Sequence, residues 1–160
     1  MTTPRWLDGD EQVTWRAFLD ATSLLTDRLD REIQHASGLS LIEYAVLAHL
    51  SEAEDRRLRM HTLAETVLVS KSRLSHQITR LEKEGLVARE TCETDRRGAF
   101  AVLTGQGYEL LVKVAPVHVE GVRRHLFDLL SEEQSQTLGE IAVILADHLR
   151  ALPAAPATRH

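Results

Sequence analysis

SKSRLSHQITRLEKEG, the stretch from residue 70 to residue 85, has the pattern of a helix that lies on the surface of a domain. Leu74, Ile78 and Leu81 are spaced i, i+4 and i+7, so they form one stripe that faces a core. Ser70 is a good N-cap, and the glycine that closes the stretch marks the C-terminus. The sequence therefore predicts one amphipathic helix over this stretch.

The outward face of the predicted helix carries cations, hydroxyls and amides, and it holds no acid before Glu82. Exposed helices usually mix charges of both signs, so this composition is unusual. Such donors suit phosphates and the acceptor edges of bases in a major groove. We expect the following residues to bind DNA: Ser70, Lys71, Ser72, Arg73, Ser75, His76, Thr79 and Arg80.

The chain on both sides of this helix completes a winged helix-turn-helix. A helix of about two turns is predicted over residues 61–67, and the short turn after it gives helix-turn-helix spacing. Residues 86–92 and 99–103 alternate as strands and are predicted to pair as a β-hairpin. Residues 58–60 are short enough to be an edge strand. The predicted fold is mainly α, with a small β-hairpin wing.

The tip of the predicted hairpin is the turn Asp95-Arg96-Arg97-Gly98. A wing beside a groove-bound helix reaches the adjacent minor groove, whose negative potential attracts arginine. Asp95 then holds one guanidinium and directs the other. Which of Arg96 and Arg97 enters the groove stays open, and the alternative is an exposed turn with an incidental ion pair.

The chain before residue 53 is predicted to form two helices. Apolar residues recur at helical spacing from Asp10 to about His35, without Gly or Pro, and Gly38 lies where a C-cap is expected. Ser40 and Glu43 have the spacing of a capping box, which begins a second helix. Its predicted inward residues are Tyr44, Leu47 and Leu50.

The chain after the hairpin is also predicted to be helical. The helical pattern runs from Thr104 to Leu129, with a kink or break at Pro116. Ser131 opens a second capping box and a last helix. The apolar stripe of that helix, together with the first helix, exceeds what a small lobe can cover, so we expect a homodimer. The stripe comprises Leu138, Ile141, Ala142, Leu145 and Leu149.

The charge of the chain is unevenly distributed. The net charge is −5, yet residues 56–97 carry 10 Lys and Arg against 6 Asp and Glu. This basic segment agrees with a nucleic-acid partner. No apolar run reaches the length of about 18 residues that a membrane span needs, and no signal peptide is recognisable. We therefore expect a cytoplasmic protein that does not enter a membrane, and the single cysteine, Cys92, agrees with a reducing compartment.

Enzymatic and metal-binding functions are not expected. The sequence contains no nucleophile motif, phosphate-binding loop or paired acids, so no catalytic residues and no cofactor are predicted. It has eight histidines, but no His-x3-His or His-Glu-x-x-His pair, so no metal site is predicted.

Several of these segments resemble the MarR (multiple antibiotic resistance regulator) family of winged-helix transcription factors. The resemblance rests on the residue 70–75 and 81–89 segments, on Asp95-Arg96-Arg97, and on Leu103-Thr104-Gly105-Gln106-Gly107. It covers roughly residues 11–152. It implies an obligate homodimer in which the first and last helices interlock and two winged helix-turn-helix lobes bind DNA.

The resemblance also implies a division of the chain and a function. Residues 1–37 and 104–152 correspond to a helical dimerisation region, residues 38–103 to the DNA-binding lobe, and residues 153–160 to a frayed tail. The implied function is that of a sequence-specific transcriptional regulator, a repressor, that binds double-stranded DNA at an inverted-repeat operator. The alternatives are a winged-helix module that binds proteins and a regulator without a small-molecule effector.

The family further implies a pocket for a small aromatic or anionic effector where the helical region meets the DNA-binding lobe. An aromatic side chain beside a cation suits an aromatic acid. The alternative is that the aromatic residues of the first helix belong to the dimer core and that the others lie on the surface. The candidate pocket residues are Trp15, Phe18, His35, Tyr44 and His49.

Overall fold

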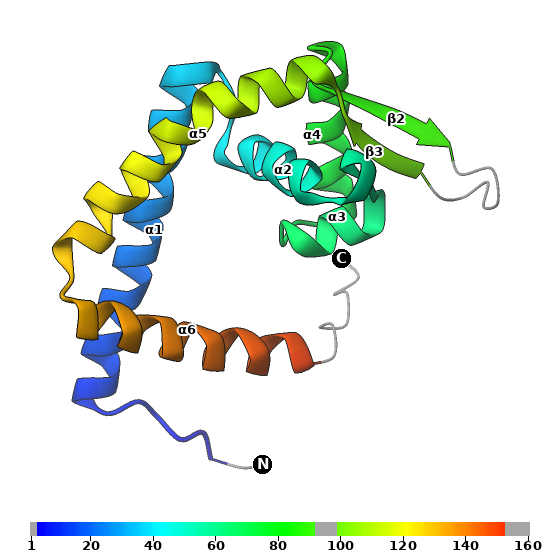
Figure 1. Cartoon of the computed structure of the whole chain (residues 1–160). Coiled ribbons are helices and arrows are strands. Elements are labelled where there is room, and N and C mark those ends of the chain that lie inside the picture. The colour runs from blue at the N-terminus through cyan, green and yellow to red at the C-terminus, as the bar shows by residue number, and fades with distance from the viewer. Residues whose placement is uncertain (1–2, 92–98, 153–160) are drawn as a thin grey trace. The chain divides into compact units, whose positions relative to one another are not determined.

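The computed structural model of the chain describes residues 3–91 and 99–152. The chain divides into two compact units, Met1–Gly121 and Val122–His160. The described residues are mostly helical and contain one small antiparallel sheet (Figure 1). The predicted class, a mainly α winged helix-turn-helix, is confirmed.

The first helix, α1 (Gly9–Ser37), has the length that the apolar pattern predicts. It begins with a capping box that the prediction missed, in which Asp8 Oδ1 accepts a hydrogen bond of 2.8 Å from the backbone N–H of Glu11. It ends at Gly38, whose φ of +76° places it in the left-handed region that favours glycine.

The second helix, α2 (Leu41–Glu52), begins with the predicted capping box of Ser40 and Glu43. Its three predicted inward residues are buried. A 3-10 turn, η1 (Glu54–Arg56), follows, and it contains two left-handed residues, Asp55 and Arg56. The edge strand β1 (Arg57–Arg59) comes next and lies one residue before its predicted position.

The helix-turn-helix consists of α3 (Met60–Thr66) and α4 (Lys71–Lys83). It is followed by the hairpin strands β2 (Val87–Thr91) and β3 (Ala99–Leu103). The sheet has the order β1-β3-β2, and both pairs are antiparallel. The hairpin is confirmed, while its predicted tip, residues 95–98, lies outside the described residues.

The core of the first unit joins all of these elements. The predicted buried stripe of α4 is fully inaccessible to solvent, and it packs with apolar residues of α2, α3 and the sheet. Ile33 of α1 and Val114 of α5 belong to the same core, so both long helices are anchored to the lobe. The lobe is thereby a rigid support for α4.

The helix α5 (Gly105–His125) begins at the base of the hairpin. Thr104 Oγ1 donates to the carbonyl of Gly85 at 2.7 Å and accepts from the N–H of Gly107 at 3.0 Å. A Cβ atom at Gly107 would overlap the carbonyl oxygen of Leu86, so only glycine fits there. These contacts give the Leu-Thr-x-x-Gly segment a structural role, because it holds the start of α5 against the turn between α4 and β2.

The helix α5 continues through Pro116 without a break, although Figure 1 shows the ribbon bending along its length. It lies beside α1 and approaches it closely at Gly121, where a Cβ atom would come within 2.9 Å of Leu29 Cδ2. Proline removes one helical hydrogen bond, which bends a helix more readily than it interrupts one. The predicted kink and the predicted break were alternatives, and the break is wrong.

The second unit contains η2 (Phe127–Leu129) and α6 (Glu132–Ala151). The predicted capping box is present, since Ser131 Oγ accepts from the N–H of Gln134 at 3.2 Å. The predicted apolar stripe of α6 is exposed in the single chain, with Ile141 at 49% and Leu149 at 64%. An exposed apolar stripe of this kind is typical of a protein–protein contact surface.

Candidate nucleic-acid interface

The outward face of α4 is formed by the side chains opposite its buried stripe. Ser70 begins the helix, since its Oγ accepts from the N–H of Arg73 at 3.2 Å. Because successive residues turn by about 100°, Ser72, His76 and Lys83 point most directly away from the core. All three are exposed. This face consists of a hydroxyl, an imidazole and an ammonium group, so it offers hydrogen-bond donors to a groove.

One flank of α4 is fixed by Arg89 of β2. The Nη2 atom of Arg89 donates to the carbonyl of Ser75 at 2.9 Å and to Thr79 Oγ1 at 3.0 Å. Its Nη1 atom lies 3.4 Å from Glu82 Oε2. Two of the predicted DNA-binding residues, Ser75 and Thr79, are therefore partners of the wing strand. These contacts of Arg89 were not predicted from the sequence, although Arg89 belongs to the segment on which the family resemblance rests.

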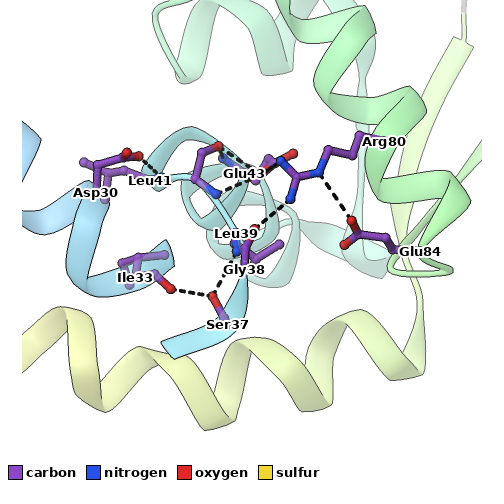
Figure 2. Close-up of polar contacts among 10 residues, drawn as sticks. Asp30, Ile33, Ser37, Gly38, Leu39, Leu41, Glu43, Arg80 and Glu84 are labelled. Atoms are coloured by element: carbon purple, nitrogen blue, oxygen red, sulfur yellow. Dashed lines mark hydrogen bonds and ion pairs between the residues drawn. The ribbon is translucent and has the colours of Figure 1, made fainter. Parts of the chain in front are cut away.

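The other flank is fixed by Arg80, which the sequence analysis assigned to DNA binding. Its Nη1 atom lies 3.3 Å from Glu43 Oε2, and its Nη2 atom donates to the carbonyl of Gly38 at 2.6 Å (Figure 2). Its Nε atom donates to Glu84 Oε1 at 3.3 Å. The guanidinium is thus directed toward the turn between α1 and α2. From the sequence, Glu43 was predicted only as a capping residue, because its other partner, Arg80, lies far away in the chain.

Three other cations of α4 have exposed side chains. Among residues 3–91 and 99–152, Lys71, Arg73 and Lys83 form no ion pair. Lys71 and Arg73 lie in the first turn, where the positive end of the helix adds to their charge. These residues are available to phosphates.

Arg73 also lines an open groove of about 560 Å³ beside α4. The groove is polar on the α1 side, where Asp27 and Asp30 carry carboxylates. Asp30 is engaged, because its Oδ1 accepts from the N–H of Leu41 at 2.7 Å. The remaining lining residues are Thr22, Ser23, Thr26, Leu41 and Ile42.

The predicted wing residues Asp95, Arg96 and Arg97 lie outside the described residues. The strand register pairs Thr91 with Ala99, so the predicted turn lies in the segment that joins these two strand ends. Next to the ends of the hairpin strands that face this segment, the guanidinium of Arg57 stacks over the ring of Phe100 at 4.2 Å and lies 3.3 Å from Glu90. Arg57, one of the arginines of the basic segment 56–97, therefore contacts other protein side chains.

The five predicted effector residues are not gathered into one pocket within a chain. Trp15 and Phe18 are half exposed, and their rings stack with centroids 6.3 Å apart. His35 lies twenty residues beyond Trp15 on the same helix, which corresponds to about 30 Å. Tyr44 packs instead against His118 of α5, at 4.6 Å between ring centroids. His49 is half-buried, and its Nδ1 atom lies 3.9 Å from Glu52.

The pair of Tyr44 and His118 lies between α2 and α5, where Tyr44 is buried and His118 is half-buried. Burial lowers the pKa of His118, and burial followed by the charge of Glu52 raises the pKa of Tyr44. The Nδ1 atom of His118 is buried and has no hydrogen-bond partner among the described residues. The neutral imidazole is therefore the form that the folded state favours.

This burial predicts a pH dependence of stability. The unfolded chain binds a proton at His118 below a pH of about 6.5, whereas the folded chain does so only at a lower pH. The free energy of unfolding should therefore decrease as the pH falls below that value. The variant His118→Phe should show a weaker decrease between pH 7.5 and 5.5 in urea titrations. Equal decreases in both proteins would show that His118 is not the source of the pH dependence.

Metal-binding clusters and membrane-spanning helices are both absent from the described part of the chain. Across residues 3–91 and 99–152, no three His, Cys, Asp or Glu side chains are grouped as a metal site would require. In the same residues, no helix combines the length and the apolar character needed to cross a membrane.

Comparison with known proteins identifies the family. A family model described as "MarR family" matches residues 37–98. The chain is similar to Sco3205 of Streptomyces coelicolor, a MarR family transcriptional regulator solved in complex with DNA, with 46% identity over 98% of this chain and 97% of that one and a TM-score of 0.89. It is also similar to AbsC, a MarR family transcriptional regulator of the same organism, with 50% identity over 93% and 100% and a TM-score of 0.87. PecS, an HTH-type transcriptional regulator of Dickeya dadantii, is 30% identical over 82% of this chain and 79% of its own length. The chain therefore belongs to the MarR family, whose members are DNA-binding transcriptional regulators and not enzymes.

Proposed function

We propose that this MarR-type regulator is a cytoplasmic homodimeric repressor that binds an inverted-repeat operator through α4. The observation that carries the proposal is the outward face of α4, where Ser72, His76 and Lys83 are exposed and no carboxylate is present. Exposed hydroxyl, imidazole and ammonium groups complement base edges and phosphates. The similarity to a relative that was solved in complex with DNA supports the same conclusion.

The apolar surfaces of α1 and α6 support a homodimer. Trp15 and Phe18 on α1, and Ile141 and Leu145 on α6, are each between 44% and 50% exposed in the single chain. Monomeric proteins rarely leave such stripes uncovered. A two-fold axis would bury them against a second copy and would repeat α4 on the other side of the dimer.

The proposed function is tested with the DNA upstream of the protein's own gene. Gel shifts over a salt series should show specific binding that weakens linearly in log salt. Footprinting should show two protected half-sites about 10 base pairs apart, because the dimer presents its two α4 helices to successive major grooves. A protein-binding winged-helix module would protect no specific sequence, and an asymmetric single half-site would contradict the dimeric mode.

The wing should contribute to affinity. Arg96→Ala and Arg97→Ala are each expected to weaken operator binding by about tenfold, since each removes one cation from the predicted minor-groove contact. Thermal unfolding should stay nearly unchanged, because turn arginines contribute little to stability. Wild-type affinity of either variant at physiological salt would contradict the role of that arginine.

The groove beside Arg73 supports a ligand-controlled repressor. A hydroxylated aromatic acid would complement it, because a carboxylate can pair with Arg73 while a hydroxyl donates to Asp27. A ligand in this groove would compete for a cation that binds DNA. A tenfold preference for the DNA-free state corresponds to about 1.4 kcal/mol.

We therefore expect an aromatic carboxylate such as salicylate, at millimolar concentration, to release the protein from its operator in gel shifts. Fluorescence of Trp15, measured in a Trp6→Phe background, distinguishes two locations for the ligand. Quenching would place it near the stacked Trp15 and Phe18 rings, whereas release without quenching favours the groove beside Arg73. Absence of release would favour a regulator without this class of effector.

A further inference from the structure

We infer that Arg80 is a positioning residue, which binds α4 to the turn between α1 and α2 and so couples the long helix α1 to the DNA-reading helix. This inference rests on the proposed function, because its consequence is measured as operator affinity. We call the turn between α1 and α2, residues 37–41, the α1–α2 junction.

The partner of Arg80 is a buried carboxylate. Glu43 has no exposed surface, whereas the side chain of Arg80 is 47% exposed. Glu43 Oε2 accepts from the N–H and the Oγ of Ser40 at 2.8 and 3.0 Å and lies 3.3 Å from Arg80 Nη1. A carboxylate removed from water is costly to bury without such partners. The ion pair is therefore a fixed contact and differs from a surface ion pair that forms and breaks freely.

The junction is itself tied to α1. Ser37 Oγ donates to the carbonyl of Ile33 at 2.8 Å and accepts from the N–H of Leu39 at 3.2 Å (Figure 2). Asp30 accepts from the N–H of Leu41 at 2.7 Å, so α1 also holds the first residue of α2. A displacement of the C-terminal end of α1 must move these groups together. Arg80 extends this connection to α4, because it donates to the carbonyl of Gly38 at 2.6 Å.

The position of Arg80 on α4 suits this role. Arg73 lies seven residues earlier, which is nearly two full turns, so the two arginines share one flank of the helix. Arg73 forms no ion pair among the described residues, while Arg80 has three acceptors within 3.3 Å. The same flank therefore carries one arginine that is available to DNA and one that is used to hold the helix. Together with Arg89 on the opposite flank, Arg80 sets the rotation of α4 about its own axis.

The test uses the pair of substitutions Glu43→Gln and Arg80→Met. The variant Arg80→Met should lose stability because Glu43 stays buried without its counter-ion, whereas in Glu43→Gln the guanidinium of Arg80 keeps Glu84 and the carbonyl of Gly38 as partners. The double variant has the net charge of the wild type and no unpaired buried charge. Its stability should return toward that of the wild type, while the connection between α4 and the junction is absent.

The expected result is that the double variant binds the operator about tenfold more weakly than the wild type, with the same dependence on salt. Glu43→Gln alone should weaken binding by a similar factor, although Glu43 is buried and cannot touch DNA. Arg73→Met is the matched control, since losing a phosphate contact should lower the salt slope by about 0.9. The effects of Arg73→Met and Glu43→Gln on the free energy of operator binding should add, whereas those of Arg80→Met and Glu43→Gln should not.

Two results would overturn the inference. A double variant that regains wild-type affinity together with stability would show that the pair only supports folding. A double variant with the reduced salt slope of the Arg73→Met control, beside a Glu43→Gln variant of normal affinity, would show that Arg80 contacts phosphate.

Hydrogen exchange without DNA separates this inference from the proposed function. Amides of the junction and of α4 should exchange faster in the folded double variant than in the wild type, and unchanged exchange would reject the connection. If the wild type bound no operator DNA, the proposed function would fail, while the exchange result would still decide whether Arg80 holds α4.

Discussion

Replacement of Ile141 and Leu145 by aspartate should dissociate the proposed homodimer and weaken operator binding at least about a hundredfold. Both residues lie on the exposed apolar stripe of α6, one helical turn apart. A carboxylate placed in a buried interface costs several kcal/mol unless it finds a partner. A monomer contacts one half-site alone, and the loss of a second linked site reduces affinity by a factor of about 10² to 10⁴.

Light scattering and gel shifts on the same samples test this prediction. The control variant combines Gln136→Asp with Arg150→Gln, which produces the same change in net charge on the same helix. Both control positions are exposed and lie away from the stripe, and the ion pair of Arg150 with Asp147 is a surface pair that contributes little. The control should remain dimeric. A stable dimer of the Ile141→Asp, Leu145→Asp variant would show that this stripe is not the interface.

The features predicted correctly from the sequence are those that depend on neighbours in the chain. The capping boxes at Ser40 and Ser131 and the left-handed Gly38 follow from spacings of a few residues. The buried stripe of α4 follows from helical periodicity, and all three of its residues are inaccessible. The strand β1 was misplaced by one residue. Asp55 and Arg56 before it both have a positive φ, but neither is a glycine, the residue that usually marks such a turn in a sequence.

The side-chain contacts around α4 that the sequence did not predict join residues distant in the chain. Arg80 and its acceptor Gly38 are separated by 42 positions, and Arg89 and Ser75 by 14. Residue types on α4 therefore indicated what could bind DNA, but not which side chains were already used by the fold. The proposed effector residues show the same limitation, because Trp15 and His35 were grouped by chemistry although the length of α1 separates them.

The substitution of Ser72 and His76 by glutamate should weaken specific binding by two or more orders of magnitude without unfolding the lobe. Both side chains are exposed at the centre of the outward face of α4. Two carboxylates there would face base edges and phosphates, and juxtaposed like charges at an interface cost several kcal/mol. The new charges are one turn apart on the helix and repel each other by only a few tenths of a kcal/mol.

The control for this last prediction is Lys113→Glu, which changes the net charge by the same two units at an exposed position on α5. At physiological salt, charges farther than about 8 Å from the DNA are largely screened, so the control should lose much less affinity than the α4 variant. Gel shifts with operator and with unrelated DNA then separate the effect of net charge from the effect of charges on the outward face of α4. Loss of operator binding by the α4 variant alone would place recognition on the face that contains Ser72 and His76. Equal losses in both variants would mean that net charge, and not that face, controls binding, and α4 would then no longer qualify as the reading helix.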